Sequence, residues 1–409
     1  MELLSTYTVE QVQEKIIKAF QDFPLKTERI PITEARGRVL AQEVISYENI
    51  PEFHRSTVDG YGVLYQDTLG ASEGLATYLQ HKFTVEMGKE APGTIEPGEC
   101  AYIPTGGMIP EGVNAVVMIE QTEAFDEHTV GIVKPVSDLE NILQKGEDIQ
   151  VGEAVFAKGD RLRTEDIGLL AGLGVAEVRV YQKIAVGLIS TGDEIVDIDK
   201  RPSLGEIRDM NRYSLGAALE RDGFSLEKTA VVKDQRKLLE ETLAEFLKNC
   251  DLVLISGGSS MGEKDYTKEV INALGEPGVF VHGVSMKPGK PTIIGKVGNK
   301  AVFGLPGQPV SALMVYEVLV KTVTKLYEKP KTEDPYLLGE MDRNFPSAPG
   351  RAHYFMVSLY EEEGKSFVTP VYGKSGTLSM MSRAMGYVVI DHNEEGLNKG
   401  DRVKVYPLT

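Results

Sequence analysis

Residues 251–291 begin with DLVLISGGSSMGEKDYTKEV and close with SMKPGKP. Residues 252–255 form a short apolar run without helical spacing, and a Gly/Ser-rich loop follows directly, so the segment predicts a buried parallel strand ending in a tight turn. We expect a helix from about Lys264. The glycines let the backbone approach a ligand closely, and the unpaired N–H groups of the helix start point toward it. The segment therefore predicts a site for a phosphate or another oxyanion.

Charged residues accompany this turn. Lys287 and Lys290 lie beside a second tight turn at Gly289, and Asp265 falls at the start of the predicted helix. Cations and a carboxylate together suggest a phosphorylated ligand with a metal ion. An ordinary strand-to-helix turn with solvated lysines would show the same local pattern, so the rest of the chain has to decide.

Composition narrows the class of protein. A chain of 409 residues exceeds what one hydrophobic core usually supports, so we expect three or more domains. The net charge of −17 disfavours a nucleic-acid partner, which needs a basic face. Cys100 and Cys250 stand far apart without CxxC spacing, so the sequence indicates neither a disulfide framework nor a zinc site.

Membrane association is not expected. The N-terminus carries Glu2 and no apolar signal region, and the longest uncharged apolar run, residues 167–176, is about half of a bilayer span. We therefore expect a cytoplasmic protein without a membrane partner.

The sequence predicts helices in the first part of the chain. Thr8 with Gln11 three positions later predicts a helix cap, and apolar residues then recur at helical spacing. Residues 32–46 predict a second helix, and residues 139–180 a helix-rich piece.

These patterns predict an α/β multidomain fold. An elongated, discontinuous helix-rich domain comprises residues 1–49 and 139–180, and short strands broken by Gly and Pro indicate an inserted β domain over 50–138. Strands and helices alternate through 181–329, which is typical of a doubly wound, mostly parallel sheet. Alternating strands in 330–409 indicate a C-terminal β domain resembling a small barrel.

Three acidic residues follow strands of the predicted parallel sheet: Glu194, Asp234 and Asp265. Since the carboxyl ends of parallel strands meet at one edge, we expect these side chains to converge there. Gathered carboxylates are unfavourable unless a cation compensates them, and Mg²⁺ suits carboxylates combined with phosphate oxygens. The competing explanation is that loop residues are acidic because loops are solvated.

Seven segments together support a family resemblance. They are PEFHRSTVDGYGV, IPTGGMIPEGVNAVV, GEDI, STGDEI, SGGSSMGEKDYT, MKPGKP and GLPGQPVSAL. In order and spacing they resemble the molybdopterin molybdenumtransferase (MoeA) family, which includes the E domain of gephyrin, and the resemblance spans essentially the whole chain.

The resemblance implies a homodimeric cytoplasmic enzyme of the last step of molybdenum cofactor synthesis. Such an enzyme takes adenylylated molybdopterin, inserts molybdate at the dithiolene and releases AMP with help from Mg²⁺. A MogA-like adenylylating protein is a candidate partner. The family layout also agrees with the predicted four domains.

The resemblance further implies site residues. Asp59 of TVDGY and Thr105 of PTGG would reach the active site from the other protomer, Asp148 of GEDI would join them, and Asp234 would orient water or a pterin donor. These four are the predicted catalytic residues.

Binding residues follow in the same way. The implied substrate-binding residues are Gly257, Gly258, Ser260, Lys287, Lys290, Pro306 and Pro309. Arg351 and Ser375 are the candidates for molybdate, although a surface arginine and a turn serine would look alike. Glu194 and Asp265 are the candidate Mg²⁺ ligands.

The chain departs from the family pattern at four positions. Gly283 stands where many members have lysine, Gln308 replaces the Asn of GLPGNP, and Met380 and Met385 replace residues that are commonly Ser and Asn. These departures leave open tungstate in place of molybdate, and a non-catalytic dimeric pterin-binding scaffold. A nucleotide phosphohydrolase using the same acidic pocket is a third reading.

Overall fold

The computed structural model describes residues 7–257, 266–330 and 334–408. The chain divides into two compact units, which are described separately. The α/β unit comprises residues 1–29, 37–41 and 179–409, and the β unit comprises 30–36 and 42–178. The four domain boundaries expected above stay a prediction.

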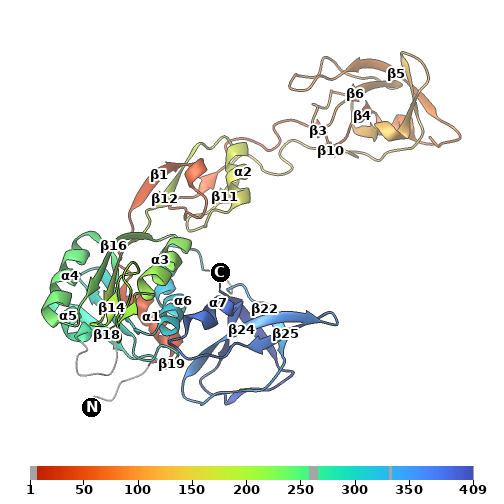
Figure 1. Cartoon of the computed structure of the whole chain (residues 1–409). Helices are drawn as coiled ribbons and strands as arrows, with labels where there is room; N and C mark the ends of the chain where they lie inside the picture. The colour runs from red at the N-terminus through yellow and green to blue at the C-terminus, as the bar shows by residue number, and fades with distance from the viewer. Residues whose placement is uncertain (1–6, 258–265, 331–333, 409) are drawn as a thin grey trace. The chain divides into compact units, whose positions relative to one another are not determined.

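A six-stranded sheet organises the α/β unit (Figure 1). Its strand order is β16 (Ser225–Val232), β13 (Ala185–Thr191), β17 (Leu252–Ser256), β21 (Lys300–Leu305), β20 (Ile293–Val297) and β18 (Pro277–His282). The first four strands run parallel, and β20 runs antiparallel to both of its neighbours. The predicted doubly wound, mostly parallel sheet is confirmed.

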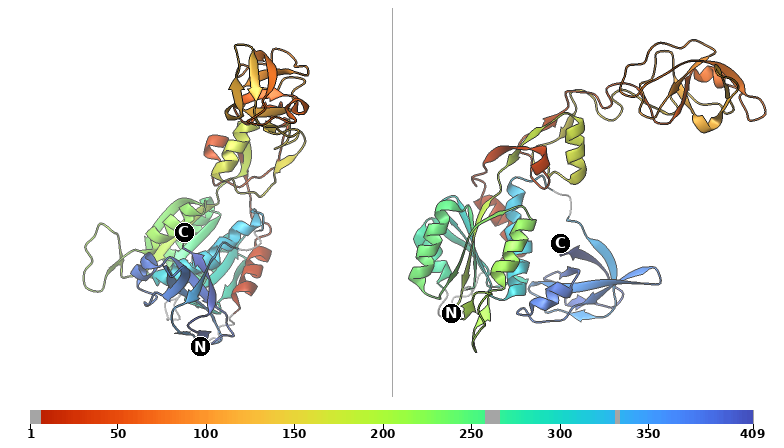
Figure 2. Two further views of the ribbon diagram at one scale, coloured as in Figure 1. Left: turned by 90° about the vertical axis from the view of Figure 1, so that its right-hand side faces the viewer. Right: turned by 45° about the horizontal axis from the view of Figure 1, so that its top comes forward.

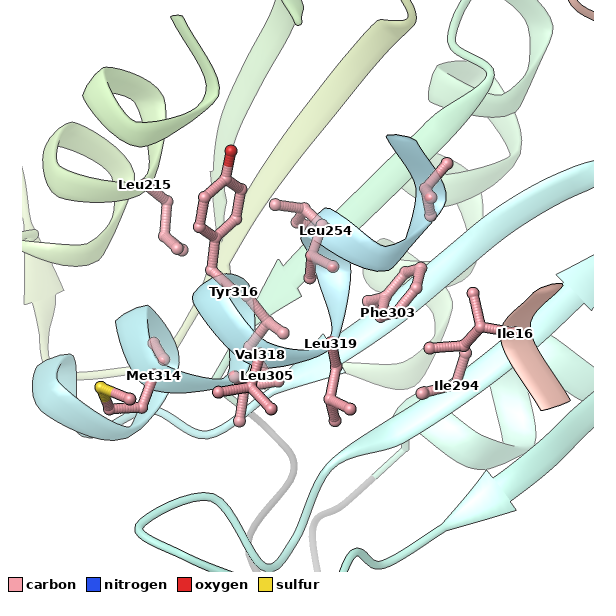
Figure 3. Packing of buried hydrophobic residues seen from close by; sticks show 14 of the residues in the cluster. Ile16, Leu215, Leu254, Ile294, Phe303, Leu305, Met314, Tyr316, Val318 and Leu319 are labelled. Carbon is pink, nitrogen blue, oxygen red and sulfur yellow. The ribbon is translucent and has the colours of Figure 1, made fainter. Parts of the chain in front are cut away.

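Helices cover both faces of this sheet (Figure 2). They are α3 (Asn211–Arg221) and α6 (Pro309–Val318) on one face, and α4 (Arg236–Asn249) and α5 (Thr267–Leu274) on the other. Successive strand residues point to opposite faces. Leu254 accordingly packs in the cluster that contains Leu215 and Tyr316 (Figure 3), whereas Ile255 packs in the cluster of α4 and α5.

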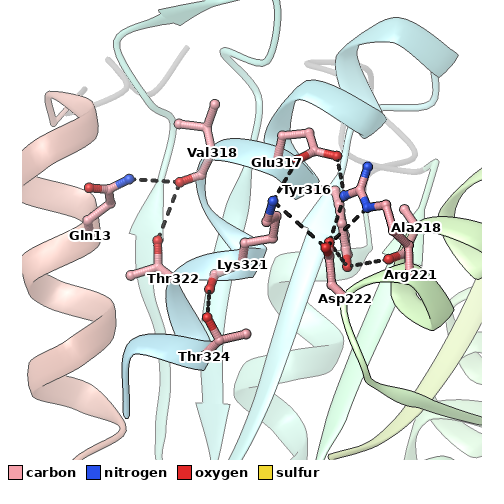
Figure 4. Close-up of polar contacts among 10 residues, drawn as sticks. All are labelled: Gln13, Ala218, Arg221, Asp222, Tyr316, Glu317, Val318, Lys321, Thr322 and Thr324. Atoms are coloured by element: carbon pink, nitrogen blue, oxygen red, sulfur yellow. Dashed lines mark hydrogen bonds and ion pairs between the residues drawn. The ribbon is translucent and has the colours of Figure 1, made fainter. Parts of the chain in front are cut away.

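The N-terminal helix α1 (Val9–Ala19) belongs to the same core. Its predicted cap is confirmed, because the Gln11 N–H donates to the Thr8 hydroxyl at 3.3 Å and the Thr8 N–H donates to the Gln11 side chain at 3.0 Å. Ile16 is fully buried. Gln13 Nε2 donates to the Val318 carbonyl at 2.8 Å, which attaches α1 to the end of α6 (Figure 4).

A buried polar network joins α6 to α3 (Figure 4). The Tyr316 hydroxyl donates to the Ala218 carbonyl at 2.9 Å and lies 2.9 Å from Asp222 Oδ2. Burial, followed by the charge of Asp222, raises the pKa of Tyr316. Arg221 pairs with Glu317 at 2.5 Å. These contacts hold the last turns of α3 and α6 together.

The C-terminal part of the α/β unit is a closed barrel. Its five strands are β24 (Ala352–Glu362), β25 (Lys365–Pro370), β22 (Leu337–Met341), β28 (Arg402–Pro407) and β26 (Gly386–Ile390). Antiparallel pairing of β24 with β26 closes it, and Phe355, Val368 and Val405 lie among its buried residues. The short strand β19 (Met286–Lys287) adds to β24. The C-terminal β-barrel expected from the sequence is confirmed.

The β unit is built on a second six-stranded sheet. Its order is β7 (Ala115–Met118), β4 (Gly60–Val63), β6 (Glu99–Ile103), β5 (Thr77–Thr84), β9 (Thr129–Ile132) and β8 (Thr122–Ala124). Two strand pairs accompany it: β3 (Arg55–Ser56) with β10 (Ile142–Leu143), and β2 (Val44–Ile45) with β11 (Ala154–Phe156).

Short elements complete the chain. They are β1 (Thr27–Pro31), which pairs with β12 (Glu177–Tyr181), β14 (Ile195–Val196) with β15 (Ile207–Arg208), β23 (Phe345–Pro346) with β27 (Gly396–Leu397), α2 (Thr164–Gly172), α7 (Leu378–Arg383), and the 3₁₀ helices Ile32–Glu34, Tyr65–Thr68, Ile119–Gln121 and Val320–Leu326. Across the described ranges no helix is long and apolar enough to cross a bilayer.

Two helix predictions were wrong. Residues 32–46 contain one short 3₁₀ helix and the strand β2, because Gly37 at φ +77° interrupts the chain and Val44–Ile45 pairs with β11. Residues 139–180 contain one α-helix and three short strands, so they are not helix-rich. In both segments, tertiary strand pairing overrides local periodicity.

Adjacent isoleucines of α1 test its docking. Ile16 is fully buried and Ile17 is 36% exposed. We expect Ile16→Ala to lower the free energy of unfolding by about 2–5 kcal/mol, because it leaves a cavity in the core. Ile17→Ala is the matched control and should cost under about 1 kcal/mol. Urea unfolding measures both, and equal losses would show that α1 does not pack as described.

Candidate functional site

Five loops meet at one edge of the α/β sheet: those that follow β13, β16, β17 and β21, and the loop between β18 and β20. Parallel β13, β16, β17 and β21 end at Thr191, Val232, Ser256 and Leu305, and their register places these ends side by side. Ligands of open α/β sheets bind outside such carboxyl ends. We call this region the carboxyl edge.

The first loop begins at Gly257, whose backbone is sterically constrained. Its φ is +102°, and a Cβ at this position would lie 2.3 Å from the Thr191 carbonyl oxygen. Its N–H donates to the Leu305 carbonyl at 3.2 Å. Only glycine fits both conditions. The predicted residues Gly258, Ser260 and Asp265 lie outside the described part of the chain.

The second loop leads into α6. Pro309 is the first residue of this helix, and Gln308 precedes it as the N-cap. The Val310 N–H donates to the Ser375 carbonyl at 3.1 Å, so Ser375 lies at the start of α6. A Cβ on Gly376 would lie 2.4 Å from Gln308 Oε1, so the longer amide of Gln308 packs against the segment that holds Ser375.

The third loop carries Lys287 and Lys290. His282, the last residue of β18, pairs with Ile293, the first residue of β20, and Ile293 also pairs with Gly304 near the end of β21. The loop between them therefore lies at the carboxyl edge. Within it, Lys290 accepts at its carbonyl from the Val284 N–H at 2.9 Å.

Lys287 and Arg351 come together through pairing of β19 with β24. Lys287 lies opposite His353, and Met286 lies opposite Ala352, the residue after Arg351. Both cationic residues are exposed. The predicted phosphate-binding lysine and the predicted molybdate-binding arginine thus share one surface, which we call the cationic pair.

His353 lies beneath the cationic pair. It is 8% exposed, and its Nδ1 is 2.9 Å from the Ser347 hydroxyl. Burial, and then the charges of Lys287 and Arg351, lower the pKa of His353 to about 4. A neutral imidazole at pH 7 leaves the positive charge of the surface to the two exposed side chains.

The acidic loops after β13 and β16 touch through Asp193. Its carbonyl accepts from Lys233 Nζ at 2.5 Å, and its Oδ1 accepts from the Asp234 N–H at 3.3 Å. Glu194 is exposed in the same loop. Within the described ranges no three His, Cys, Asp or Glu side chains are grouped to hold a metal ion. The predicted convergence of Glu194 and Asp234 with Asp265 stays a prediction, because Asp265 lies outside the described residues.

The β unit gathers a separate set of predicted residues. The Thr105 N–H donates to Asp59 Oδ1 at 2.8 Å, which joins the TVDGY and PTGG segments. The Asp148 N–H donates to the Ile50 carbonyl at 3.0 Å, and the three side chains are exposed. Asp59 and Thr105 are thus in direct contact within this unit.

Two residues at the carboxyl edge escaped the sequence analysis. Asn211 and His353 are buried polar side chains at contacts between distant segments. The only sequence signal for Asn211 is weak: it is a polar residue at the start of a helix that follows a parallel strand. No local sequence pattern marks His353. Its partners are β19, from a distant part of the chain, and the Ser347 hydroxyl.

The backbone conformation explains one departure from the family pattern, the glycine at position 283. Gly283 has φ +95° and its N–H donates to the Thr292 carbonyl at 2.8 Å. A lysine at this position would be strained in the left-handed region.

The fold and the carboxyl edge define a multidomain α/β protein whose sheet edge has two exposed cationic residues next to a small barrel. Three family descriptions match: the MoeA N-terminal region (domain I and II) over residues 7–174, a probable molybdopterin binding domain over 187–325, and the MoeA C-terminal region (domain IV) over 339–408. The chain belongs to the MoeA family.

Relatives match over nearly the whole chain. The molybdopterin molybdenumtransferase of Haemophilus influenzae is 32% identical, covering 98% of both chains, and that of Bacillus subtilis is 28% identical, covering 93% of this chain and 89% of the relative. The crystal structure of the molybdopterin biosynthesis MoeA protein from Pyrococcus horikoshii OT3 aligns with a TM-score of 0.82 at 28% identity, covering 98% of this chain and 100% of that one.

Gly257→Ala tests the first loop. Gly205 is the matched control, because its φ is +92° but a Cβ there would meet no atom within 4 Å. We expect Gly205→Ala to lower the free energy of unfolding by about 1–2 kcal/mol through backbone strain alone. Gly257→Ala should cost about 1–3 kcal/mol more because of overpacking. Equal losses in urea unfolding would contradict the close approach to Thr191.

His353 gives a pH prediction. Since its pKa falls from 6.5 to about 4 on folding, the unfolded state binds more protons between these values. The contribution of His353 to the free energy of unfolding is therefore fully present above about pH 6.5. It is lost as the pH falls toward 4, and the whole loss is about 3 kcal/mol. NMR titration of the folded protein should place its pKa near 4, and the pH dependence of stability should weaken in His353→Gln. Titration near 6.5 would contradict this environment.

Proposed function

We propose that this chain is a molybdopterin molybdenumtransferase, which inserts molybdenum into adenylylated molybdopterin and releases AMP. The observation that carries the proposal is the meeting of the Gly257 turn, the start of α6 and the cationic pair at one edge. Family membership over the whole chain and the names of its relatives support the same substrate.

The two substrates require different groups. A phosphoanhydride needs a closely approaching backbone and cations. We propose Gly257, whose missing side chain permits the close approach, and the cations Lys287 and Lys290, with Gly258 and Ser260. Pro306 and Pro309 shape the turn before α6. Molybdate is a dianion and a substrate, and we assign it to the guanidinium of Arg351 and the hydroxyl of Ser375.

The proposed contribution of each unit differs. The carboxyl edge binds and orients the substrates, and Asp234 orients the attacking water. We assign Asp59, Thr105 and Asp148 to the active site of a second copy of the chain, so the proposal includes a homodimer. Direct contact between Asp59 and Thr105 supports their acting as one group.

Mg²⁺ is part of the proposal through Glu194 and Asp265. When bound, it would shield charge on the phosphoanhydride. We further propose a cytoplasmic location and a MogA-like protein as supplier of the adenylylated substrate.

Removing either member of the cationic pair tests the proposal. The assay follows AMP release from adenylylated molybdopterin with Mg²⁺ and molybdate. With each substrate varied in turn, we expect Arg351→Ala to raise the KM for molybdate, and Lys287→Ala the KM for adenylylated molybdopterin, about 10–100-fold, because each loses a charge-assisted hydrogen bond of about 1.5–3 kcal/mol.

The control is Lys237→Ala, whose side chain is 90% exposed on α4. Its KM should not change. Wild-type protein that binds the substrate without releasing AMP would instead favour the non-catalytic scaffold, and AMP release from unrelated adenylates would favour a phosphohydrolase.

A further inference from the structure

Asn211 connects two loops of the carboxyl edge. It is the first residue of α3 and is 8% exposed. Its Nδ2 donates to the Ser256 hydroxyl at 2.6 Å and to the Gly307 carbonyl at 2.8 Å. An amide NH₂ has two hydrogens, so both are used in bridging the end of β17 to the turn before α6.

The bridged loops approach each other directly. Besides the bond from the Gly257 N–H to the Leu305 carbonyl, a Cβ on Gly307 would lie 3.6 Å from the Gly257 Cα. Ser256 immediately precedes Gly257. A small change in the Asn211 bridge would therefore change the separation of the two turns that we assign to the phosphate-bearing part of the substrate.

The position of Asn211 is itself fixed by its neighbours. Asp209 Oδ1 accepts from the Arg212 N–H at 3.0 Å, and Arg212 Nη2 pairs with Asp197 at 2.9 Å. Asp209 is 3% exposed. These bonds anchor the start of α3, and the Tyr316 network anchors its other end.

The amide oxygen of Asn211 takes no part in the bridge. Among the described residues, Asn211 Oδ1 is buried and has no hydrogen-bond partner. A buried amide oxygen without a partner is costly unless water or a ligand donates to it. The hydrogen bonds that place the side chain are thus those of its two donors.

We propose that Asn211 is a positioning residue that sets the spacing of the Gly257 and Gly307 turns, and so determines affinity for the phosphate-bearing substrate. This inference rests on the proposed function. Asn211 acts through the two turns and touches no reacting atom.

Asn211→Asp tests the bridge because it keeps the size of the side chain and removes both donors. Asn272→Asp is the matched control: Asn272 Oδ1 accepts from the Val279 N–H at 2.7 Å, so aspartate preserves that bond. Asn211→Ser retains one donor and should behave between wild type and Asn211→Asp.

Two measurements on the full chain decide the matter. Hydrogen exchange should be faster in peptides that contain Gly257 and Gly307 in Asn211→Asp, and unchanged there in Asn272→Asp. In the AMP-release assay, we expect the KM for adenylylated molybdopterin to rise about tenfold or more with kcat within about threefold. Lower thermal stability with unchanged KM, or unchanged exchange at both turns, would overturn the proposal.

The two proposals can fail separately. If wild-type protein releases no AMP, the proposed function fails, and equilibrium binding of AMP itself then tests the bridge. Binding to wild type that is weakened about tenfold in Asn211→Asp would support the positioning role. Equal binding to both proteins, or to neither, would overturn it.

Discussion

The register of four parallel strands is the constraint on which the candidate site depends. Because Ser256 aligns with Ser190 on one side and Leu305 on the other, the chain has to turn at three neighbouring points. The turns therefore lie close together. Gly257 avoids a steric clash because it has no side chain to collide with the Thr191 carbonyl. The chain can therefore turn close to the end of β13 at Gly257, where any side chain would collide with the Thr191 carbonyl.

The barrel completes this edge with charge that the sheet does not supply. β19 leaves the sheet and pairs with β24, which brings Lys287 to Arg351 across a long stretch of sequence. His353 between them is neutral because burial and both cations oppose its protonation. A protein of net charge −17 thereby keeps a local positive surface suited to a small dianion.

The sequence predicted correctly those strands and helix caps that depend on interactions between residues close together in the chain. The apolar run before Gly257 became β17, and Thr8 with Gln11 formed the predicted cap. Residues 32–46 were predicted wrongly because strand pairing with β11 outweighs their helical periodicity. The antiparallel part of the sheet has a related origin: β20 pairs with β21 and β18 pairs with β20, and neither pairing is encoded in one segment alone.

The candidate site divides in the same way. Glycine turns and lysines near them are visible in the sequence, and the family resemblance added Arg351 and Ser375, which the structure places at β24 and at the start of α6. Asn211 and His353 could not be found, since Asn211 bonds to Ser256 and His353 pairs with Lys287, each more than forty residues away.

The most direct measurement is anomalous diffraction from crystals of the full-length protein grown with saturating molybdate. We predict a molybdenum peak whose oxygens lie within hydrogen-bonding reach of Arg351 and Ser375, about 3 Å from the nearest side-chain donor atom. A molybdenum peak away from the carboxyl edge, with no density between these two side chains, would contradict this prediction.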